Sequence, residues 1–365
     1  MNETERRKLS HIEVCLSKDV QNRSIKTGFD DVSLIHKSTP EVDFRSISTS
    51  TSLFRHKLLL PIVIAGMTGG TAKAAKLNGI LAQAAEKFKI GMGVGSQRAA
   101  LEKKSLAYTF SVVRDKAPTA FLIANIGCSQ LLEEGGIEKA REAVEMIEAD
   151  ALAVHLNPLQ EIVQFEGQAN FKGVIKRLKE LTGSLEVPIL AKEVGAGISL
   201  EVAMELEVAG VRGLDIGGAG GTSWSAVEYH RAEMNGDEFR QRIGKTFWDW
   251  GIPTAISLVE SRQSTKLPLI ATGGVRTGLD IAKAIALGAD ACGIAYPLLK
   301  AATKGLEAVS KEIGHVEMEL RTALFLTGCS SVQELAKSPV IITGKAAEWL
   351  SARGINTSEY ARRGE

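Results

Sequence analysis

Polar side chains follow the short apolar runs of this sequence, at the points where each run ends. They are Thr68, Ser96, Gln97, Arg98, Asn125, His155, Asn157, Lys192 and Thr222, with Gln160 and Glu161 just beyond. If the runs are parallel strands, their carboxyl ends meet at one rim. So many polar groups there would be costly to bury unless they faced a ligand. The set supports a phosphate-bearing cofactor, with a second anionic ligand near Arg98.

Residues 267–298 carry the strongest phosphate signal. Residues 268–271 predict a short buried strand, Gly273-Gly274-Val275-Arg276 predicts a glycine turn, and residues 291–295 predict a second buried strand. Successive glycines let backbone N–H groups approach an anion closely. A lone Gly-Gly is most often just a turn. Two such strands in succession favour the phosphate site found after the last strands of many (β/α)8 barrels.

Two side chains near the predicted rim each allow two interpretations. Lys192 ends an apolar run that starts at Pro188. It forms a salt bridge inside the barrel, with Glu193 its neighbour, or it places a cation beside an electron-rich ring that must hold negative charge. His155 is a satisfied core histidine or, beside Asn157, a functional group. We favour the functional interpretation of His155 and leave Lys192 open.

Two further charged features depend on their surroundings. Glu161 is an isolated carboxylate with no HxxE or DxD partner, so we expect no site built wholly of protein ligands. Mg²⁺ often uses one carboxylate with waters and substrate phosphates. The basic cluster Arg6-Arg7-Lys8, followed by His11, is typical of a solvated tail. It becomes a phosphate clamp only if the N-terminal arm folds over a barrel mouth.

Eight apolar runs alternate with helical patterns along the chain. The predicted strands are residues 58–65, 90–94, 120–124, 151–154, 188–191, 211–216, 268–271 and 291–295. Helical spacing predicts helices over residues 72–88, 105–116, 137–148, 171–181, 200–209, 281–287 and 311–326. This α/β pattern favours a single closed (β/α)8 TIM barrel. An open doubly wound sheet is less favoured, because no GxGxxG turn follows the first strand.

Two segments interrupt the alternation. Residues 1–57 are polar and aperiodic, and we expect an N-terminal arm that contributes to the substrate site, ahead of one barrel domain over residues 58–365. The long segment 223–251 holds three of the four tryptophans, Trp224, Trp248 and Trp250. It is a solvated surface insertion or a lid that orders on a ligand, and we favour a lid loop over residues 222–251, after strand six.

Composition excludes several classes of protein. The 365 residues are 44% hydrophobic and 24% charged, with a net charge of +1, so nothing suggests a nucleic-acid surface. Cys15, Cys128, Cys292 and Cys329 show no CxxC pair and no metal-ligand spacing, as in reduced cytosolic proteins. No segment has the length of a signal-peptide core or a membrane span. We therefore expect a cytoplasmic protein.

From Arg6 to about Gly344 the sequence resembles the type 2 isopentenyl-diphosphate isomerases, which are FMN-dependent (β/α)8-barrel enzymes. The most specific motif is HLNPLQE at residues 155–161, whereas Gly-Gly-x-Arg is shared by many flavin barrels. The other matching motifs are Arg6-Arg7-Lys8 with His11, Met67-Thr68-Gly69-Gly70, Gly95-Ser96-Gln97-Arg98, Lys192-Glu193 and Gly273-Gly274-Val275-Arg276.

The resemblance implies that isopentenyl and dimethylallyl diphosphate interconvert on reduced FMN with Mg²⁺, and that NAD(P)H keeps the flavin reduced. It also implies a homo-oligomer, a tetramer or octamer. The implied FMN contacts are Met67, Thr68, Ser96, Asn125, Lys192, Thr222, Gly273, Gly274, Arg276, Ala295 and Tyr296. The implied substrate contacts are Arg7, Lys8, His11, Ser96, Gln97, Arg98, His155, Asn157 and Gln160, and Glu161 is the implied metal ligand.

The implied reaction protonates a carbon–carbon double bond and removes a proton from the other side. It needs no net electron transfer, so the flavin can act as an acid and a base. We expect Gln160, His155 and Lys192 to be the catalytic residues. In this hypothesis reduced FMN moves the proton, Gln160 positions or relays it, His155 faces the substrate, and Lys192 stabilises the anionic reduced flavin.

An FMN-dependent 2-hydroxy-acid oxidoreductase is the alternative. That chemistry needs a histidine with an arginine at a strand end, and neither the sixth nor the seventh predicted strand is followed by a histidine. A dehydrogenase of the inosine-monophosphate type needs a nucleophilic cysteine in a rim loop, and Cys128 follows the wrong kind of strand. A barrel that merely binds nucleotide would not explain the crowded polar rim.

Overall fold

The computed structural model describes residues 3–364, and at its centre is a closed parallel barrel. Around the barrel the strands run in the order β10, β11, β4, β5, β6, β7, β8, β9. Each overlaps a strand expected from the sequence, so the predicted (β/α)8 barrel is confirmed. The strands are β4 (Ile62–Ile64), β5 (Gly91–Gly93), β6 (Leu122–Gly127), β7 (Ala151–Leu156), β8 (Ile189–Glu193), β9 (Gly213–Asp215), β10 (Leu269–Thr272) and β11 (Ala291–Ile294).

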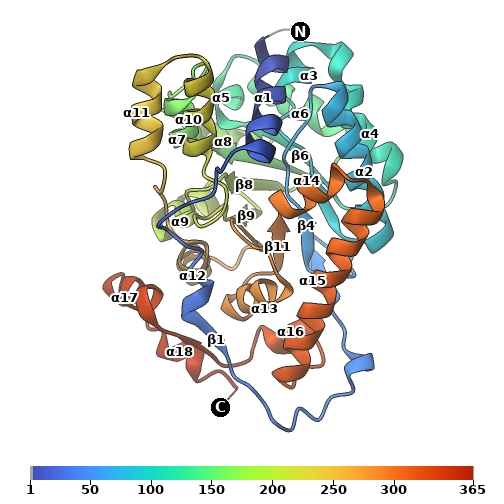
Figure 1. Cartoon of the computed structure of the whole chain (residues 1–365), viewed down its shortest axis with the longest axis vertical. Helices are drawn as coiled ribbons and strands as arrows, with labels where there is room; N and C mark the ends of the chain where they lie inside the picture. Colours follow the sequence, from blue (N-terminus) through green and yellow to red (C-terminus); the bar gives the residue numbers. More distant parts are fainter. Residues whose placement is uncertain (1–2, 365) are drawn as a thin grey trace.

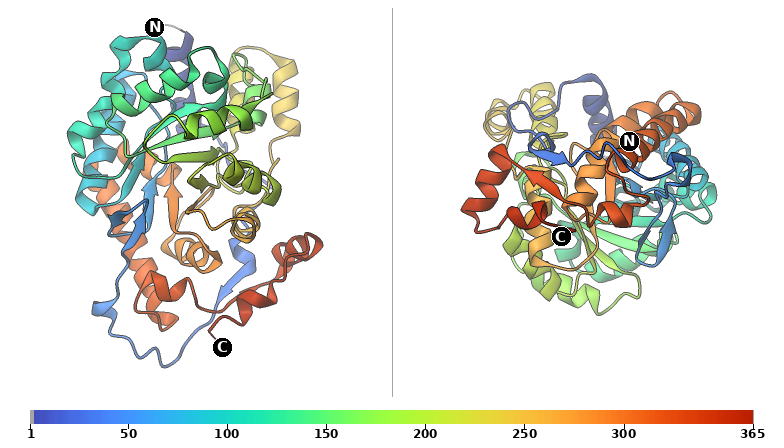
Figure 2. Two further views of the ribbon diagram at one scale, coloured as in Figure 1. Left: turned by 180° about the vertical axis from the view of Figure 1, so that it is seen from behind. Right: turned by 90° about the horizontal axis from the view of Figure 1, so that it is seen from below.

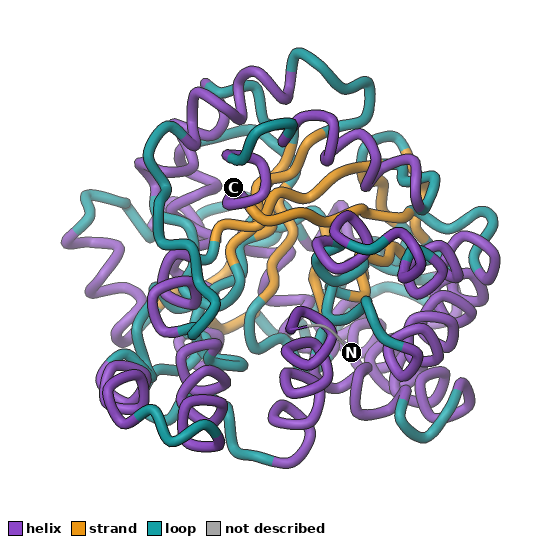
Figure 3. The backbone as a smooth tube through the Cα atoms, turned by 90° about the horizontal axis from the view of Figure 1, so that it is seen from above, coloured by secondary structure: helices purple, strands orange, loops and turns teal. Residues whose placement is uncertain are grey.

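Helices surround these strands when the molecule is seen from above (Figure 3). The helices predicted from spacing are all present, as α2 (Ala72–Phe88), α4 (Tyr108–Lys116), α6 (Gly136–Met146), α8 (Val174–Thr182), α9 (Leu200–Val208), α13 (Gly278–Leu287) and α15 (Leu306–Leu326). Local signals set their ends. The Thr71 side chain accepts from the backbone N of Ala74 at the start of α2, and Gly288, with φ 113°, ends α13.

Further helices complete the rim and the C-terminal segment. They are α3 (Arg98–Glu102), α5 (Cys128–Leu132), α7 (Pro158–Val163), α12 (Thr254–Ser264), α14 (Tyr296–Ala302), α16 (Val332–Leu335), α17 (Gly344–Ala352) and α18 (Ser358–Ala361), with 3-10 turns η1 (Phe29–Asp31), η2 (Phe44–Ser46) and η3 (Lys104–Leu106). No helix of residues 3–364 is both long and apolar enough to cross a membrane.

The N-terminal arm is not aperiodic in its described part, which corrects the sequence-based expectation. Its first element is α1 (Glu3–Ser17), and this helix packs against α10 (Trp224–Met234) (Figure 1). The helix is mostly polar, with Ile12 and Val14 as its buried apolar residues. Two such positions in fifteen residues give too little periodicity to reveal a helix from the sequence.

The segment predicted as a lid loop is largely helical. It contains α10 and α11 (Glu238–Thr246), which pack on each other. Trp248 is buried in a small apolar cluster that includes Val14 and Val20 from the arm and Val227 from α10. The arm and the lid segment therefore form one packed unit.

The barrel interior is apolar at the amino ends of the strands. Leu190 and Ile270 belong to this interior cluster, which a hairpin of β2 (Thr51–Leu53) and β3 (His56–Leu58) closes from outside. At the hairpin turn Phe54 packs against the interior cluster, and its ring stacks on Phe121 with centroids 6.0 Å apart. This plug leaves the opposite end of the barrel for polar side chains.

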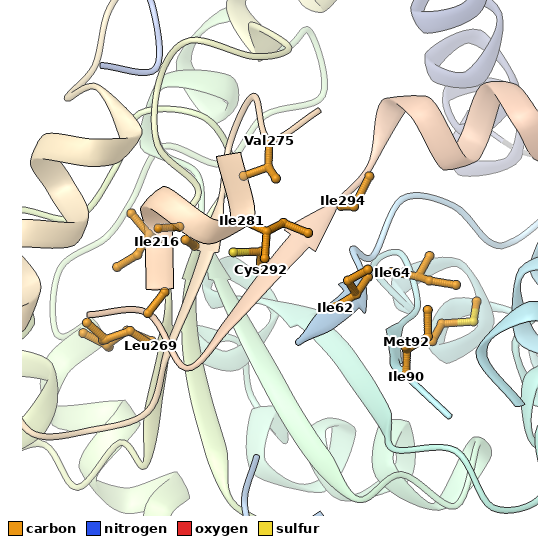
Figure 4. Close-up of a cluster of buried hydrophobic side chains, with 14 of the residues drawn as sticks. Ile62, Ile64, Ile90, Met92, Ile216, Leu269, Val275, Ile281, Cys292 and Ile294 are labelled. Atoms are coloured by element: carbon orange, nitrogen blue, oxygen red, sulfur yellow. The ribbon is translucent and has the colours of Figure 1, made fainter. Parts of the chain in front are cut away.

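The alternate side chains of each strand face outward and pack under the helices. Ile62, Ile64, Ile216, Leu269 and Ile294 lie in this larger core, together with residues of the surrounding helices (Figure 4). Away from α1, β1 (Val32–Leu34) pairs antiparallel with β12 (Val340–Ile342), and α17 and α18 lie at the same end of the molecule (Figure 2).

Candidate active site

The carboxyl ends of the barrel strands open into one cavity, which α1 and the start of α10 also line. Every residue predicted for the site lines this cavity except Gln97. The polar groups at the strand ends therefore face one cavity, and the arm folds over the barrel mouth. The solvated-tail interpretation of the basic cluster does not hold for Arg7 and Lys8.

Gln97 points away from the cavity, which corrects its expected place at the substrate site. Its Oε1 accepts from the backbone N of Asn125 at 2.8 Å, and its Nε2 donates to the carbonyl of Ala143 at 2.8 Å. The side chain ties the loop after β5 to β6 and α6. Its sequence neighbours Ser96 and Arg98 line the cavity instead.

One face of α1 forms a cationic wall of the cavity. It presents Arg7, Lys8 and His11, and Arg98 faces the same cavity from α3. Arg7 and Lys8 are 8% and 9% exposed, and neither side chain makes an ion pair with another described residue. Burial and the charge of Arg98 lower the pKa of Arg7. Burial, Arg7 and Arg98 lower the pKa of Lys8 to about 7. Buried basic side chains that form no ion pair indicate a site for a polyanion.

Apolar side chains follow this cationic wall, and the sequence analysis did not include them in the site. Ile12 and Cys15 lie one turn further along α1, and Trp224 begins α10. The rings of His11 and Trp224 meet edge to face, with centroids 5.2 Å apart. The cavity thus suits a ligand with a polyanionic end and a small apolar end. These residues could have been found from the sequence only by recognising α1 as a helix.

His155 is held in one protonation state by Asn125. Nδ2 of Asn125 donates to the carbonyl of Val94 at 3.0 Å, so its Oδ1 faces Nδ1 of His155 at 2.8 Å. We infer that Nδ1 carries the hydrogen and that Nε2 is free to accept. Burial, followed by the charge of Lys8, lowers the pKa of His155 to about 3. The histidine is therefore neutral near pH 7.

The amides of the HLNPLQE motif form a connected group at the start of α7. Nδ2 of Asn157 donates to Oε1 of Gln160 and to Oε1 of Glu161, both at 3.0 Å. Nε2 of Gln160 lies 3.2 Å from Oε1 of Glu228 and 3.3 Å from Oε1 of Gln164. Each amide orientation is therefore set by its neighbours, and the Gln160 side chain is held at the cavity wall.

Glu228, which the sequence analysis missed, joins three elements of the site. Its Oε1 lies 2.8 Å from Nε2 of His11 on α1, and its Oε2 accepts from Arg231 at 2.6 Å. Arg231 also pairs with Glu166 at 2.7 Å. Burial alone would raise the pKa of Glu228, but His11 and Arg231 hold this pKa at about 2. The carboxylate therefore stays charged and links α1, α7 and α10.

Lys192 is ion-paired and also lines the cavity, so its interpretation as a salt bridge inside the barrel is confirmed and its place beside a cofactor ring stays a prediction. Its partner is Asp215, with Nζ 2.7 Å from Oδ2. Glu193 is not the partner. Its carboxylate accepts hydrogen bonds from the backbone N–H groups of the next three residues, and burial raises the pKa of this carboxyl to about 7.

The predicted phosphate turn has the backbone that close approach requires. Gly273 and Gly274 have φ values of 111° and 74°, which favour glycine. A Cβ on Gly274 would lie 2.4 Å from Cγ2 of Thr27 and 2.6 Å from the carbonyl oxygen of Gly220. Ala295 and Tyr296 line the cavity beside this turn.

Gln21, another residue absent from the sequence prediction, ties the arm to this turn. Its Oε1 accepts from Nη2 of Arg276 at 2.7 Å, and its Nε2 donates to Oγ1 of Thr222 at 3.4 Å. Burial lowers the pKa of Arg276. One arm residue therefore connects two side chains expected to contact the cofactor.

Unsatisfied buried atoms around the cavity fit a bound cofactor and cation. Oγ1 of Thr68 and of Thr272, and Oδ1 of Asn157, have no hydrogen-bond partner among the residues that the structure describes. The threonines lie at the strand ends, as ligand-binding hydroxyls would. Among residues 3–364 no cluster of three or more His, Cys, Asp or Glu could hold a metal. The carboxylate of Glu161 suits Mg²⁺ completed by ligand phosphates and water.

Known proteins resemble this chain over nearly all of its length. A family model described as FMN-dependent dehydrogenase matches residues 138–342. An isopentenyl-diphosphate delta-isomerase of Archaeoglobus fulgidus is 50% identical over 351 residues, covering 96% of this chain and 99% of that protein. Its counterpart in Methanosarcina barkeri is 46% identical over 362 residues, covering 99% and 98%.

Solved structures share the fold at much lower identity. A mandelate oxidase with (S)-2-phenylpropionate has a TM-score of 0.63 and 17% identity, covering 93% of this chain and 97% of that chain. The same enzyme with benzoyl-formic acid has a TM-score of 0.63 and 15% identity, with the same coverage. These likenesses support the barrel fold.

Proposed function

Because the chain belongs to the isopentenyl-diphosphate delta-isomerase family, a family of isomerases, we propose that it interconverts isopentenyl and dimethylallyl diphosphate. The FMN-dependent dehydrogenase model covers more than half of the chain and supports FMN as the cofactor. We further propose that Mg²⁺ is required, that NAD(P)H keeps the flavin reduced, and that the protein acts in the cytoplasm as a homo-oligomer.

The observation that carries the proposal is that the buried basic side chains of Arg7 and Lys8 lie on the wall of the cavity and form no ion pair within the described part of the chain. A diphosphate would supply the missing negative charge. The apolar side chains of Ile12 and Trp224 leave room for a short alkenyl group nearby. A substrate with a polyanionic head and a small hydrocarbon tail fits this arrangement.

The residues around the rim fit FMN in two parts. Met67, Thr68, Ser96, Asn125, Lys192 and Thr222 would hold the ring and ribityl chain, and Gly273, Gly274, Arg276, Ala295 and Tyr296 would hold the phosphate end. When bound and reduced, FMN supplies an electron-rich ring able to exchange a proton without net electron transfer.

The chain's own residues would prepare the substrate. Arg7, Lys8 and Arg98 would bind the diphosphate. Neutral His155 would face the substrate, with Nε2 able to accept a hydrogen bond from a bound water. Glu161 would hold Mg²⁺, and Asn157 would face the substrate diphosphate. The Gln160 amide, fixed by Glu228, would lie by the alkene and position or relay the proton.

Exclusion of water is a second role for the chain. Protonating an alkene gives a tertiary cation that water would trap. We propose that the packed unit of α1 and α10 keeps water from it. Oxidation of 2-hydroxy acids remains without support from the site, since no histidine follows β9 or β10 within the glycine turns.

The test is an anaerobic proton NMR assay in deuterium oxide with isopentenyl diphosphate, Mg²⁺ and FMN, with and without a reductant. We expect deuterated dimethylallyl diphosphate only in the reduced sample. No conversion with FMN bound and reduced would refute the isomerase proposal. Oxidation of a 2-hydroxy acid in the same preparation would favour the alternative.

A further inference from the structure

A row of polar side chains runs along three adjacent barrel strands, beginning at the cavity wall. The strand register pairs His155 on β7 with Lys192 on β8, and Lys192 with Asp215 on β9. We propose that Asp215 is a positioning residue that holds the ammonium of Lys192 and, through its own negative charge, sets the reduction potential of bound FMN. This inference rests on the FMN site of the proposed function.

The contacts of Asp215 are those of a residue that acts through another. Lys192 lines the cavity, whereas Asp215 does not. Their side chains are 9% and 11% exposed, and Nζ of Lys192 lies 2.7 Å from Oδ2 of Asp215. The other oxygen, Oδ1, is buried and has no hydrogen-bond partner in residues 3–364. An unsatisfied buried carboxylate oxygen is unfavourable for folding, so stability alone does not explain this aspartate.

Apolar neighbours of Asp215 screen its charge only weakly, so this charge can act on groups in the cavity. Side chains alternate along a strand, so Leu190 lies one layer below Lys192, and Ile270 is the register partner of Asp215 on β10. Both apolar residues belong to the interior cluster, where charges are weakly screened. Burial and the charges of Lys8 and Lys192, in that order, lower the pKa of His155, which is the direction expected if charges in this row act on one another.

This placement gives Asp215 two effects. It takes one of the three ammonium hydrogens of Lys192, which leaves the others for a ligand in the cavity. Its negative charge also opposes the anionic form of a reduced flavin, so the Lys192–Asp215 pair stabilises that form less than lysine alone would. Without the carboxylate charge, reduced FMN would bind more tightly relative to oxidised FMN, and the potential would rise.

The experiment measures the midpoint potential of bound FMN by reductive titration against a reference dye. We expect Asp215→Asn to raise the affinity for reduced FMN, relative to that for oxidised FMN, at least tenfold. This change corresponds to a rise of about 30 mV in the midpoint potential of a two-electron couple. Asp215→Glu keeps the charge and should stay near the wild-type potential. The matched control is Asp150→Asn, which removes a half-buried carboxylate paired with Arg114 at 2.9 Å, at the amino end of β7. It should leave the potential unchanged.

The outcomes separate this inference from the proposed function. An unchanged or lowered potential of bound FMN in Asp215→Asn would overturn the inference about Asp215. Equally weakened binding of oxidised and reduced FMN would also overturn it, because that is the result expected of a purely structural aspartate. If Asp215→Asn does not fold, a large shift in Asp215→Glu would overturn it instead. Wild-type protein that binds FMN but isomerises nothing would refute the proposed activity and leave the potentials measurable. Wild-type protein that binds no FMN would overturn both.

Discussion

Oε1 of Glu228 lies 2.8 Å from Nε2 of His11, and this contact joins the lid segment to the N-terminal arm. Glu228 is 2% exposed, and Arg231 depends on it for one of its two ion pairs. We expect Glu228→Gln to lower the free energy of unfolding by about 3 kcal/mol, the low end for a broken buried pair, because Arg231 keeps Glu166. Urea denaturation measures this change.

The contribution of Glu228 to stability also depends on pH. The pKa of Glu228 is about 2 in the folded protein, below its ordinary value, so its contribution to stability is present above about pH 4.5 and is lost as the pH falls towards 2. Glu233→Gln is the matched control on α10, since the Glu233 side chain is 47% exposed and its partner His230 lies 3.1 Å away. It should change stability by less than about 0.5 kcal/mol. Equal effects of the two substitutions would contradict the role of Glu228.

Lys8 should take up a proton when a diphosphate binds. Burial, Arg7 and Arg98 lower its pKa to about 7, so at pH 8 the amine is mostly neutral in the free protein. A bound polyanion restores the charge. With inorganic pyrophosphate at pH 8 we expect uptake of about one proton per molecule bound. Calorimetry in buffers of different ionisation enthalpy measures it.

The control for this experiment is Lys104→Met, which removes a lysine that is 69% exposed and paired with Glu142. It should preserve the uptake, and Lys8→Met should abolish it. In the absence of ligand, Lys8 also gives stability a pH dependence of defined sign. Between about pH 7 and 10.5 the unfolded chain binds the Lys8 proton and the folded chain does not, so this residue makes stability rise with pH. Uptake that persists in Lys8→Met would assign the proton to another group.

The fold was largely readable from the sequence because each barrel strand is a short apolar run followed by polar residues. The same regularity located the strand-end residues of the site, such as Thr68 and Lys192. It could not show that Asp215, 23 residues later, is the partner of Lys192, because that pairing depends on the register of β8 and β9. The neighbour in sequence, Glu193, turns back to its own backbone.

The arm and lid were the weakest part of the prediction for a related reason. The apolar side of α1 is narrow, and much of its other surface lines the cavity through Arg7, Lys8 and His11. Charged residues that bind a ligand look like solvated residues in a sequence. Glu228 was missed likewise, since only the packed structure shows that it faces His11 and Gln160.

Gln160→Asn should separate catalysis from cofactor binding. Gln160 accepts from Asn157 and donates towards Glu228 and Gln164, and the loss of one methylene withdraws the amide from these contacts. We expect kcat to fall about 100-fold or more, with FMN affinity unchanged. Gln333→Asn, whose parent side chain bonds to the Ser50 carbonyl, is the control and should keep full activity. Full turnover in Gln160→Asn would exclude the assigned role.

Gly274→Ala should weaken FMN binding, whereas the same substitution at a glycine far from the cavity should not. At φ 74° an alanine is strained, and its Cβ would lie 2.6 Å from the carbonyl oxygen of Gly220, a backbone atom that cannot easily move. The turn must then shift, so we expect the Kd for FMN to rise at least about tenfold, since about 1.4 kcal/mol of strain suffices. Quenching of flavin fluorescence measures the Kd.

Gly314→Ala is the matched control for the glycine turn. It lies within α15, and a Cβ there would meet nothing within 4 Å. The same chemical change should stabilise the protein by about 0.5–1 kcal/mol, because glycine is unfavourable inside a helix, and it should leave FMN binding unchanged. If Gly274→Ala bound FMN as tightly as Gly314→Ala does, the turn after β10 would not be the phosphate site, and the phosphate would have to be sought beside Ala295 and Tyr296 alone.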